Sequence, residues 1–120
     1  HCTASGKLYL STLSKDEVRH LIEVAGLTQF SVETITSIDA LEAELEVIRG
    51  QGFAIDHQEF LAGTIAVGIP VFDFKRRLSL ILTVQAPIFR LPLDAVERCL
   101  PVLREAANRL ELMMQPDAAS

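Results

Sequence analysis

The sequence predicts an α+β domain in which an antiparallel sheet is flanked by helices. Three observations support this fold class. Apolar residues recur at helical spacing in the first half of the chain, residues 53–85 alternate as β-strands do, and helical spacing returns near residue 92. Consecutive strands between helices are typical of α+β domains. The 120 residues are enough for one domain and not for two.

Two helices are predicted at the start of the chain. The first runs from about Ser5 to Leu13. The second begins at a capping box, Ser14-Lys15-Asp16-Glu17, in which the Ser hydroxyl accepts from the N3 amide and Glu17 reaches back. Gly26 is its expected end. Its apolar face has the spacing i, i+3, i+4, i+7 and consists of Val18, Leu21, Ile22 and Ala25.

A third helix follows a polar connection across residues 28–36. Thr36-Ser37-Ile38-Asp39 resembles a second capping box, and Gly50 or Gly52 is the expected end of the helix. Its apolar stripe is formed by Ile38, Leu41, Leu45 and Ile48. After it the pattern changes period, and strands are predicted over residues 53–57, 64–71 and 78–85.

The last two strands are predicted to form an antiparallel hairpin through the charged turn at residues 73–77. Burial selects the register, because one face of each strand carries a row of aliphatic residues. Pairing the two rows places Val67 opposite Val84 and Ile69 opposite Leu82. A slip by one residue would set aliphatic side chains against small and polar ones.

The same register determines the other face of the hairpin. It places Ala66 opposite Gln85 and Gly68 opposite Thr83. Because Ala66 and Gly68 are small, this face has space. The polar side chains of their cross-strand partners, Thr83 and Gln85, are expected to point into this space.

The final helix is predicted from about Pro92 to Met114. Pro101 lies within it and is expected to kink or split it, because proline has no N–H. The apolar stripe could form a coiled-coil seam, but packing across the sheet is the favoured use. Residues 115–120 are expected to be a flexible tail after a domain of residues 1–114. The stripe consists of Leu93, Val96, Leu100, Leu103, Ala107, Leu110 and Met114.

Composition excludes several classes of function. The chain has 11 Lys and Arg and 16 Asp and Glu, which gives a net charge of −5. Because binding to a nucleic-acid backbone needs clustered cations, this charge argues against the chain binding nucleic acid by itself. With no Trp and 6% aromatic residues, a stacking platform for single strands is not expected. No segment reaches the roughly 18 apolar residues of a membrane span. Cys2 and Cys99 are too few for a disulfide scaffold and predict free thiols in the cytoplasm.

Motifs for catalysis and metal binding are absent from the sequence. Gly6-Lys7 lacks the upstream glycine and the following Ser or Thr of a phosphate-binding loop. No paired His or Cys spacing indicates a metal site, and no G-x-S-x-G elbow indicates a nucleophile. The chain is therefore predicted to be no enzyme and to hold no metal or cofactor.

Two segments are candidates for ligand binding. Asp56 ends an alternating strand, either as an exposed strand-end carboxylate or as a carboxylate at the rim of a pocket that accepts from a ligand hydroxyl. Thr3-Ala4-Ser5-Gly6 precedes a helix, where free backbone N–H groups can bind a carboxylate or phosphate. The alternative there is simple N-capping by Thr3 or Ser5.

Four motifs together resemble the IclR family of transcriptional regulators. The stretch His1 to Leu10, HCTASGKLYL, resembles the family's H-x-T-A-x-G-K-A-x-L. Residues 49–59, RGQGFAIDHQE, resemble R-x-x-G-Y-A-x-D-D-E-E, and residues 70–73 match P-V-F-D. The stretch at residues 86–91, APIFRL, resembles S-G-P-x-x-R-L/I. Order and spacing match from residue 1 to about 112.

The resemblance implies a GAF-like, profilin-like effector-binding domain whose N-terminal part this chain lacks. Family members assemble into homodimers or homotetramers and bind DNA through a winged helix-turn-helix, which would lie outside this chain. The chain opens at His1 without a Met, as a fragment would. The first strands of the domain are expected to be missing, so the sheet and pocket are predicted not to close from this chain alone.

The resemblance also places an effector pocket. Small carboxylates and aromatic acids are typical effectors, and binding one would modulate DNA binding. Ala66 stands where a polar residue or Cys can occur and Gln85 where Ser is common, so the identity of the effector does not carry over. An oligomerisation module with a degenerate pocket is the alternative. The implied pocket residues are Ala4, Ser5, Gly6, Asp56, Thr64, Ala66, Thr83 and Gln85.

Overall fold

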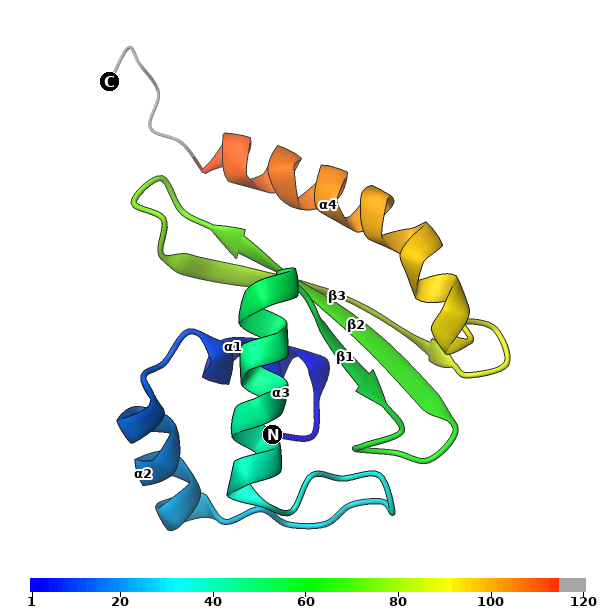
Figure 1. The fold of residues 1–120 in the computed structure, drawn as a ribbon. Helices are drawn as coiled ribbons and strands as arrows, with labels where there is room; N and C mark the ends of the chain where they lie inside the picture. The colour runs from blue at the N-terminus through cyan, green and yellow to red at the C-terminus, as the bar shows by residue number, and fades with distance from the viewer. Residues whose placement is uncertain (115–120) are drawn as a thin grey trace.

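The computed structural model describes residues 1–114 and confirms the α+β fold (Figure 1). Three strands form one antiparallel sheet in the order β1-β2-β3. The tail predicted at residues 115–120 lies outside the described residues. The elements are α1 (Ala4–Ser11), α2 (Lys15–Ala25), α3 (Ile38–Gln51), β1 (Ala54–His57), β2 (Thr64–Phe72), β3 (Leu78–Pro87), a short 3-10 helix η1 (Leu93–Ala95) and α4 (Val96–Met113).

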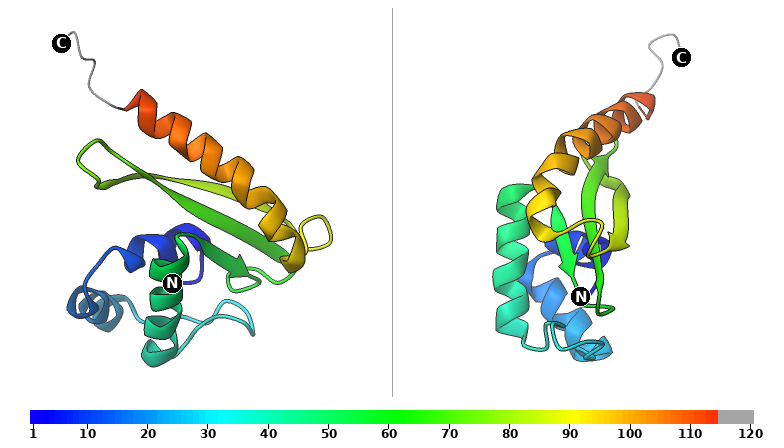
Figure 2. Two further views of the ribbon diagram at one scale, coloured as in Figure 1. Left: turned by 45° about the horizontal axis from the view of Figure 1, so that its top comes forward. Right: turned by 90° about the vertical axis from the view of Figure 1, so that its right-hand side faces the viewer.

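Helices lie on both faces of the sheet (Figures 1 and 2). On one face, α1 packs on the sheet and α3 packs on α1, around a core that includes Leu8, Leu45 and Ala66. On the other face, α4 covers the aliphatic row of β2. Alternation along β2 explains the two layers, because neighbouring residues of a strand point to opposite faces. The row under α4 consists of Ile65, Val67, Ile69 and Val71.

The predicted hairpin register is confirmed from Thr64 to Val71, and it shifts by one residue between Val71 and Phe72. Val67 pairs with Val84 and Ile69 with Leu82 on the α4 side. The structure adds the register of β1, which no pattern in the sequence determined: it runs antiparallel to β2 with Asp56 opposite Ala66.

Capping residues fix the helix starts, with one correction to the prediction. The capping box of α2 is confirmed, since Ser14 Oγ accepts from Glu17 N at 3.1 Å and Glu17 Oε1 accepts from Ser14 N at 3.2 Å. For α3 the cap is Ser37 rather than Thr36, and Ser37 Oγ accepts from Ala40 N. The helix ends at Gly52, whose φ of 79° is left-handed, a conformation that glycine adopts without steric cost.

Pro101 was predicted to kink or split the last helix, and it does not split it: α4 continues from Val96 to Met113. Because proline has no N–H, α4 lacks the hydrogen bond from residue 101 to the carbonyl of Glu97. Glu97 lies in the first turn of α4, so only one bond near the helix start is lost. Val96 before the proline and Leu103 and Ala107 after it are all buried against the sheet. The predicted packing of this stripe across the sheet is thereby confirmed.

Within residues 1–114, no helix has both the length and the apolar character needed to cross a membrane.

Candidate functional site

A cavity of about 160 Å³ lies between the start of α1 and the sheet. Six of the eight predicted pocket residues line it. Thr3, from the predicted segment Thr3-Ala4-Ser5-Gly6, and Phe60, which was not predicted, complete it. A larger hollow of about 740 Å³ beside Tyr9, Arg76 and Leu80 has no buried lining residue. The smaller cavity is distinguished by polar groups that converge on it from β1, β3 and the start of α1. Its predicted lining residues are Ala4, Ser5, Asp56, Ala66, Thr83 and Gln85.

Sheet register brings the strand residues of the cavity together. Asp56 in β1 pairs with Ala66 in β2, and Ala66 pairs with Gln85 in β3, so the three form one row across the sheet. Thr83 lies two residues along β3 from Gln85, opposite Gly68. Residues two apart in a strand share a face. Asp56, Ala66, Thr83 and Gln85 therefore form the sheet side of the cavity.

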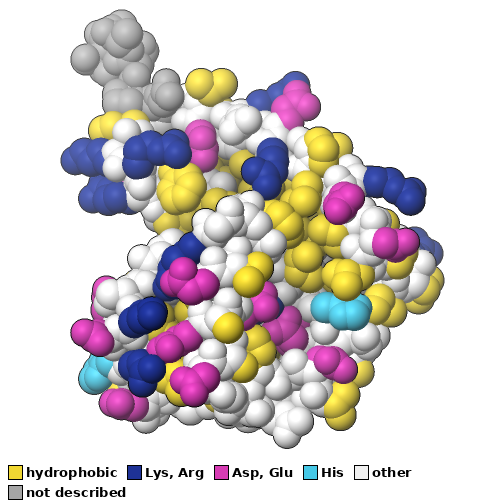
Figure 3. Space-filling view, viewed as in Figure 1, with side chains coloured by type: hydrophobic (Ala, Val, Ile, Leu, Met, Phe, Trp, Pro, Cys, Tyr) yellow, Lys and Arg dark blue, Asp and Glu magenta, His cyan; other side chains and the backbone are white. Residues whose placement is uncertain are grey.

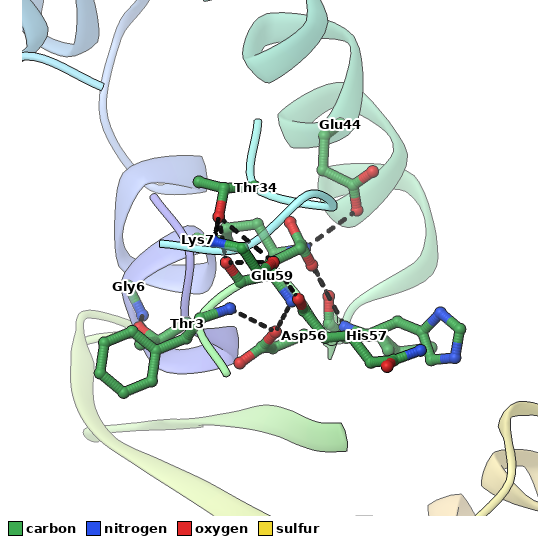
Figure 4. Close-up of polar contacts among 12 residues, drawn as sticks. Thr3, Gly6, Lys7, Thr34, Glu44, Asp56, His57 and Glu59 are labelled. Atoms are coloured by element: carbon green, nitrogen blue, oxygen red, sulfur yellow. Dashed lines mark hydrogen bonds and ion pairs between the residues drawn. The ribbon is translucent and has the colours of Figure 1, made fainter. Parts of the chain in front are cut away.

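Asp56 is buried, with 3% of its surface exposed, which excludes the exposed strand-end alternative. Its Oδ1 accepts from the backbone N–H of Glu59 at 2.8 Å and of Phe60 at 3.4 Å (Figure 4). One oxygen thus holds the turn that follows β1. Among residues 1–114 no donor is bonded to Oδ2, which leaves that oxygen for a ligand donor.

The start of α1 forms the opposite side of the cavity. Thr3 is the N-cap: its Oγ1 accepts from Gly6 N at 3.0 Å, and its carbonyl accepts from Lys7 N at 3.0 Å. In the described part of the chain, the N–H groups of Ala4 and Ser5 have no acceptor. Two donors at the positive end of a helix therefore remain beside the cavity.

Two residues of the predicted pocket do not line this cavity. The N–H of Gly6 is already used by the cap, and a Cβ at this position would lie 2.7 Å from Thr3 Oγ1. Glycine is needed there for capping, not for ligand contact. Thr64 is the first residue of β2 and pairs with Pro87. Its hydroxyl donates to the carbonyl of Leu61 at 2.7 Å.

Thr83 and Gln85 remain exposed on β3, which is an edge strand of the sheet within residues 1–114. The cavity is thus covered by α1 and the turn after β1, while its β3 side is open.

A buried ion pair lies beside the cavity, and sequence patterns did not indicate it. Lys7 is 1% exposed and Glu59 is 7% exposed. Lys7 Nζ donates to Glu59 Oε2 at 2.7 Å and to the carbonyl of Ile55, and lies 3.6 Å from Glu44 Oε1 (Figure 4). Burial raises the pKa of the Glu59 carboxyl, although the hydrogen bond from Lys7 opposes the rise. The pair joins α1 to the turn that carries Glu59.

Charge on the surface is mixed. On the face shown in Figure 3, Lys and Arg side chains lie among Asp and Glu, apart from a group at the turn between β2 and β3, where Lys75, Arg76 and Arg77 are exposed. Hydrophobic side chains gather in a band beside α4 on the same face. This face therefore offers no extended basic surface for a phosphate backbone.

Comparisons with known proteins agree with this fold. Residues 1–112 match the family described as bacterial transcriptional regulator IclR C-terminal. The probable transcriptional regulator SauR of Cupriavidus necator is 38% identical over 110 residues, covering 92% of this chain and 44% of that protein. The p-hydroxybenzoate hydroxylase transcriptional activator of Acinetobacter baylyi is 29% identical over 111 residues, covering 92% and 41%. The chain thus spans less than half the length of these relatives.

Solved structures show the same arrangement. A double mutant of the inducer-binding domain of PobR from Acinetobacter, in complex with 3-hydroxybenzoic acid, superposes with a TM-score of 0.88 at 28% identity, over 92% of this chain and 64% of that one. The C-terminal domain of KdgR from Escherichia coli gives 0.84 at 29% identity, over 94% and 69%. Members of the matched family are transcriptional regulators, not enzymes. The chain belongs to the IclR family of bacterial transcriptional regulators and forms an effector-binding C-terminal domain of that family.

Proposed function

We propose that this domain senses a small organic acid in the cavity between α1 and the sheet. The effector would modulate DNA binding by a winged helix-turn-helix outside this chain, in the cytoplasm. The observation that carries the proposal is the row of Asp56, Ala66 and Gln85 facing the free N–H groups of Ala4 and Ser5. These groups provide donors and an acceptor on opposite sides of one small space.

The lining suggests how an acid would be oriented. Neither Lys nor Arg lines the cavity, so a ligand carboxylate would be held by the N–H groups of Ala4 and Ser5 and by the amide of Gln85. Asp56 would repel a carboxylate and accept from a ligand hydroxyl or N–H. A hydroxy acid has a carboxylate that can accept from these donors and a hydroxyl that can donate to Asp56. The 3-hydroxybenzoic acid bound to the PobR domain is a molecule of this type.

Size limits the effector further. The volume of about 160 Å³ is below the roughly 300 Å³ at which pockets for drug-sized ligands begin. The ligand is therefore expected to be a small acid rather than an extended metabolite.

The mechanism of sensing would be differential binding. An effector that contacts both α1 and the sheet favours the arrangement in which these two elements are close, and disfavours others. Coupling to DNA follows if the regulator binds DNA with different affinity in the two arrangements.

A ligand screen tests the proposal. Melting of the chain would be measured with pyruvate, lactate, benzoate and 3-hydroxybenzoate, and at least one acid is expected to raise the melting temperature. The double variant Asp56→Asn/Thr83→Ala should lose this rise, whereas the exposed control Asp94→Asn should keep it. Stabilisation by none of the acids, or an unchanged response of the double variant, would overturn the assignment.

Assembly into homodimers or homotetramers is a further part of the proposal. The apolar stripe on α4 that suggested an oligomerisation seam packs on the sheet of the same chain, and Leu103 in this stripe is 5% exposed. A Leu103→Asp variant would therefore test folding and not assembly. Val102 on the same helix is 69% exposed, so sedimentation of Val102→Asp is the appropriate measurement.

A further inference from the structure

We propose that Phe60 determines the specificity of the cavity. Its ring would form the wall against which a flat, ring-bearing acid packs, so that such acids bind better than short aliphatic acids. This inference rests on the proposed function, because it concerns the same cavity.

Phe60 is the one large apolar side chain among the residues that line the cavity. The other apolar contributions come from Ala4 and Ala66, which are small. Phe60 is also 44% exposed, so the ring is not buried in the core and retains surface to contact a ligand. An aromatic side chain that is partly uncovered at a cavity gains by contact with a second ring.

The backbone of Phe60 is held by the same carboxylate that lines the cavity. Asp56 Oδ1 accepts from the N–H of Phe60 at 3.4 Å and from the N–H of Glu59 at 2.8 Å. Gln58, which opens this turn, has a left-handed φ of 63°, so the turn depends on these bonds to hold its shape. The backbone that carries the ring is thus held beside the group that would bind the ligand hydroxyl.

A second segment holds the turn from the outside. In the connection between α2 and α3, the Ser31 hydroxyl donates to the carbonyl of Gln58 and the Thr34 hydroxyl donates to the carbonyl of Glu59. The turn is therefore bonded through its N–H groups on the cavity side and through its carbonyls on the other. Such a turn is rigid before a ligand arrives, which lowers the entropic cost of binding.

Phe30, in the same connection, supports the ring of Phe60. The two ring centroids lie 5.4 Å apart at an interplanar angle of 52°, a tilted arrangement typical of stabilising aromatic pairs. His1 lies next to Phe30, with centroids 6.4 Å apart. Contact with Phe30 therefore favours the observed position of the Phe60 ring.

Calorimetric titration of the 120-residue chain tests the inference. The probes are benzoate and 3-hydroxybenzoate as ring-bearing acids, with pyruvate and lactate as short acids. Phe60→Leu should weaken binding of the ring-bearing acids by roughly three- to tenfold and change binding of the short acids by less than about twofold. Phe60→Tyr keeps a ring and should retain the wild-type preference.

Matched controls separate this effect from general destabilisation. Phe74→Leu alters another exposed ring, in the turn between β2 and β3, and should leave both affinities unchanged. Phe30→Leu should shift the preference in the same direction as Phe60→Leu, but less. A ratio of affinities that Phe60→Leu leaves at its wild-type value would overturn the inference.

The wild-type titration distinguishes this inference from the proposed function. If the wild-type chain binds none of the four acids, the proposed function fails and the inference fails with it. If it binds the short acids better than the ring-bearing ones, the proposed function stands and only the role of Phe60 is refuted.

Discussion

Lys7 Nζ and Glu59 Oε2 lie 2.7 Å apart, and both side chains are almost wholly buried. They belong to the two segments that enclose the cavity. Lys7 follows Ala4 and Ser5 on α1, and Glu59 lies between Asp56 and Phe60 in the chain. The pair therefore fixes the distance between the helix start and the turn, on which the geometry of the cavity depends.

Removing the cation should destabilise the domain strongly. Lys7→Met leaves Glu59 buried without its partner, and we expect the free energy of unfolding in urea to fall by about 3–5 kcal/mol. Arg109→Ala breaks the exposed pair with Glu105 and should cost at most about 1 kcal/mol. Adding Glu59→Gln to Lys7→Met should recover part of the loss. A cost for Lys7→Met that is no larger than for Arg109→Ala would show that the pair contributes little.

The Glu59 carboxyl makes stability depend on pH. Burial raises its pKa from the ordinary value of 4.5, so the folded protein holds this proton to higher pH than the unfolded chain does. The resulting stabilisation is complete below pH 4.5 and is lost as pH rises through the raised pKa. Glu59→Gln removes the titration, so the unfolding free energy of the variant should fall less than that of wild type over this interval. Identical pH profiles of the two proteins would contradict the direction of the shift.

Asp56 has two functions that substitutions can separate. Asp56→Asn keeps a carbonyl oxygen for the N–H groups of Glu59 and Phe60 but replaces the second acceptor by an N–H₂ donor. We expect a change in stability of less than about 1 kcal/mol and a loss of roughly tenfold in affinity for 3-hydroxybenzoate. Asp56→Ala should lower affinity and also lower the unfolding free energy by about 1–3 kcal/mol. Equal affinities of wild type and Asp56→Asn would refute a ligand contact through this side chain.

Two glycines in helices should respond oppositely to alanine. At Gly6 an added Cβ would lie 2.7 Å from Thr3 Oγ1, so Gly6→Ala displaces the capping hydroxyl at a cost of about 1 kcal/mol. At Gly50, in α3, an added Cβ meets nothing within 4 Å, and Gly50→Ala should stabilise the domain by about 0.5–1 kcal/mol. Thermal unfolding of the two variants shows directly whether each substitution stabilises or destabilises the domain. Stabilisation by Gly6→Ala would contradict the assigned role of this glycine.

The sequence predicted the β2–β3 part of the site well, because alternation and burial together leave one register for that hairpin. Once Val67 is opposite Val84, Ala66 must be opposite Gln85, and the two lie on the face away from α4. That part of the cavity follows from a period of two residues and needs no tertiary information.

The remainder depends on contacts between segments far apart in the chain. Lys7 and Glu59 are separated by 52 residues, and no periodicity indicates that they meet. Phe60 is brought to the cavity by a turn whose shape depends on Asp56. Gly6 was assigned to the pocket because a motif cannot distinguish an N–H used by a cap from one that is free. Pro101 was expected to kink or split its helix. It does not split it, and residues before and after the proline both pack on the sheet.

The most direct test of the central claim is a titration of the chain with the same four acids, followed by amide proton–nitrogen correlation NMR. The cavity assignment predicts that the largest shifts belong to the N–H groups of Ala4 and Ser5, with Glu59 and Phe60 next, because these lie around the proposed ligand. Largest shifts around the hollow beside Tyr9 and Arg76, or no shifts at all, would contradict it.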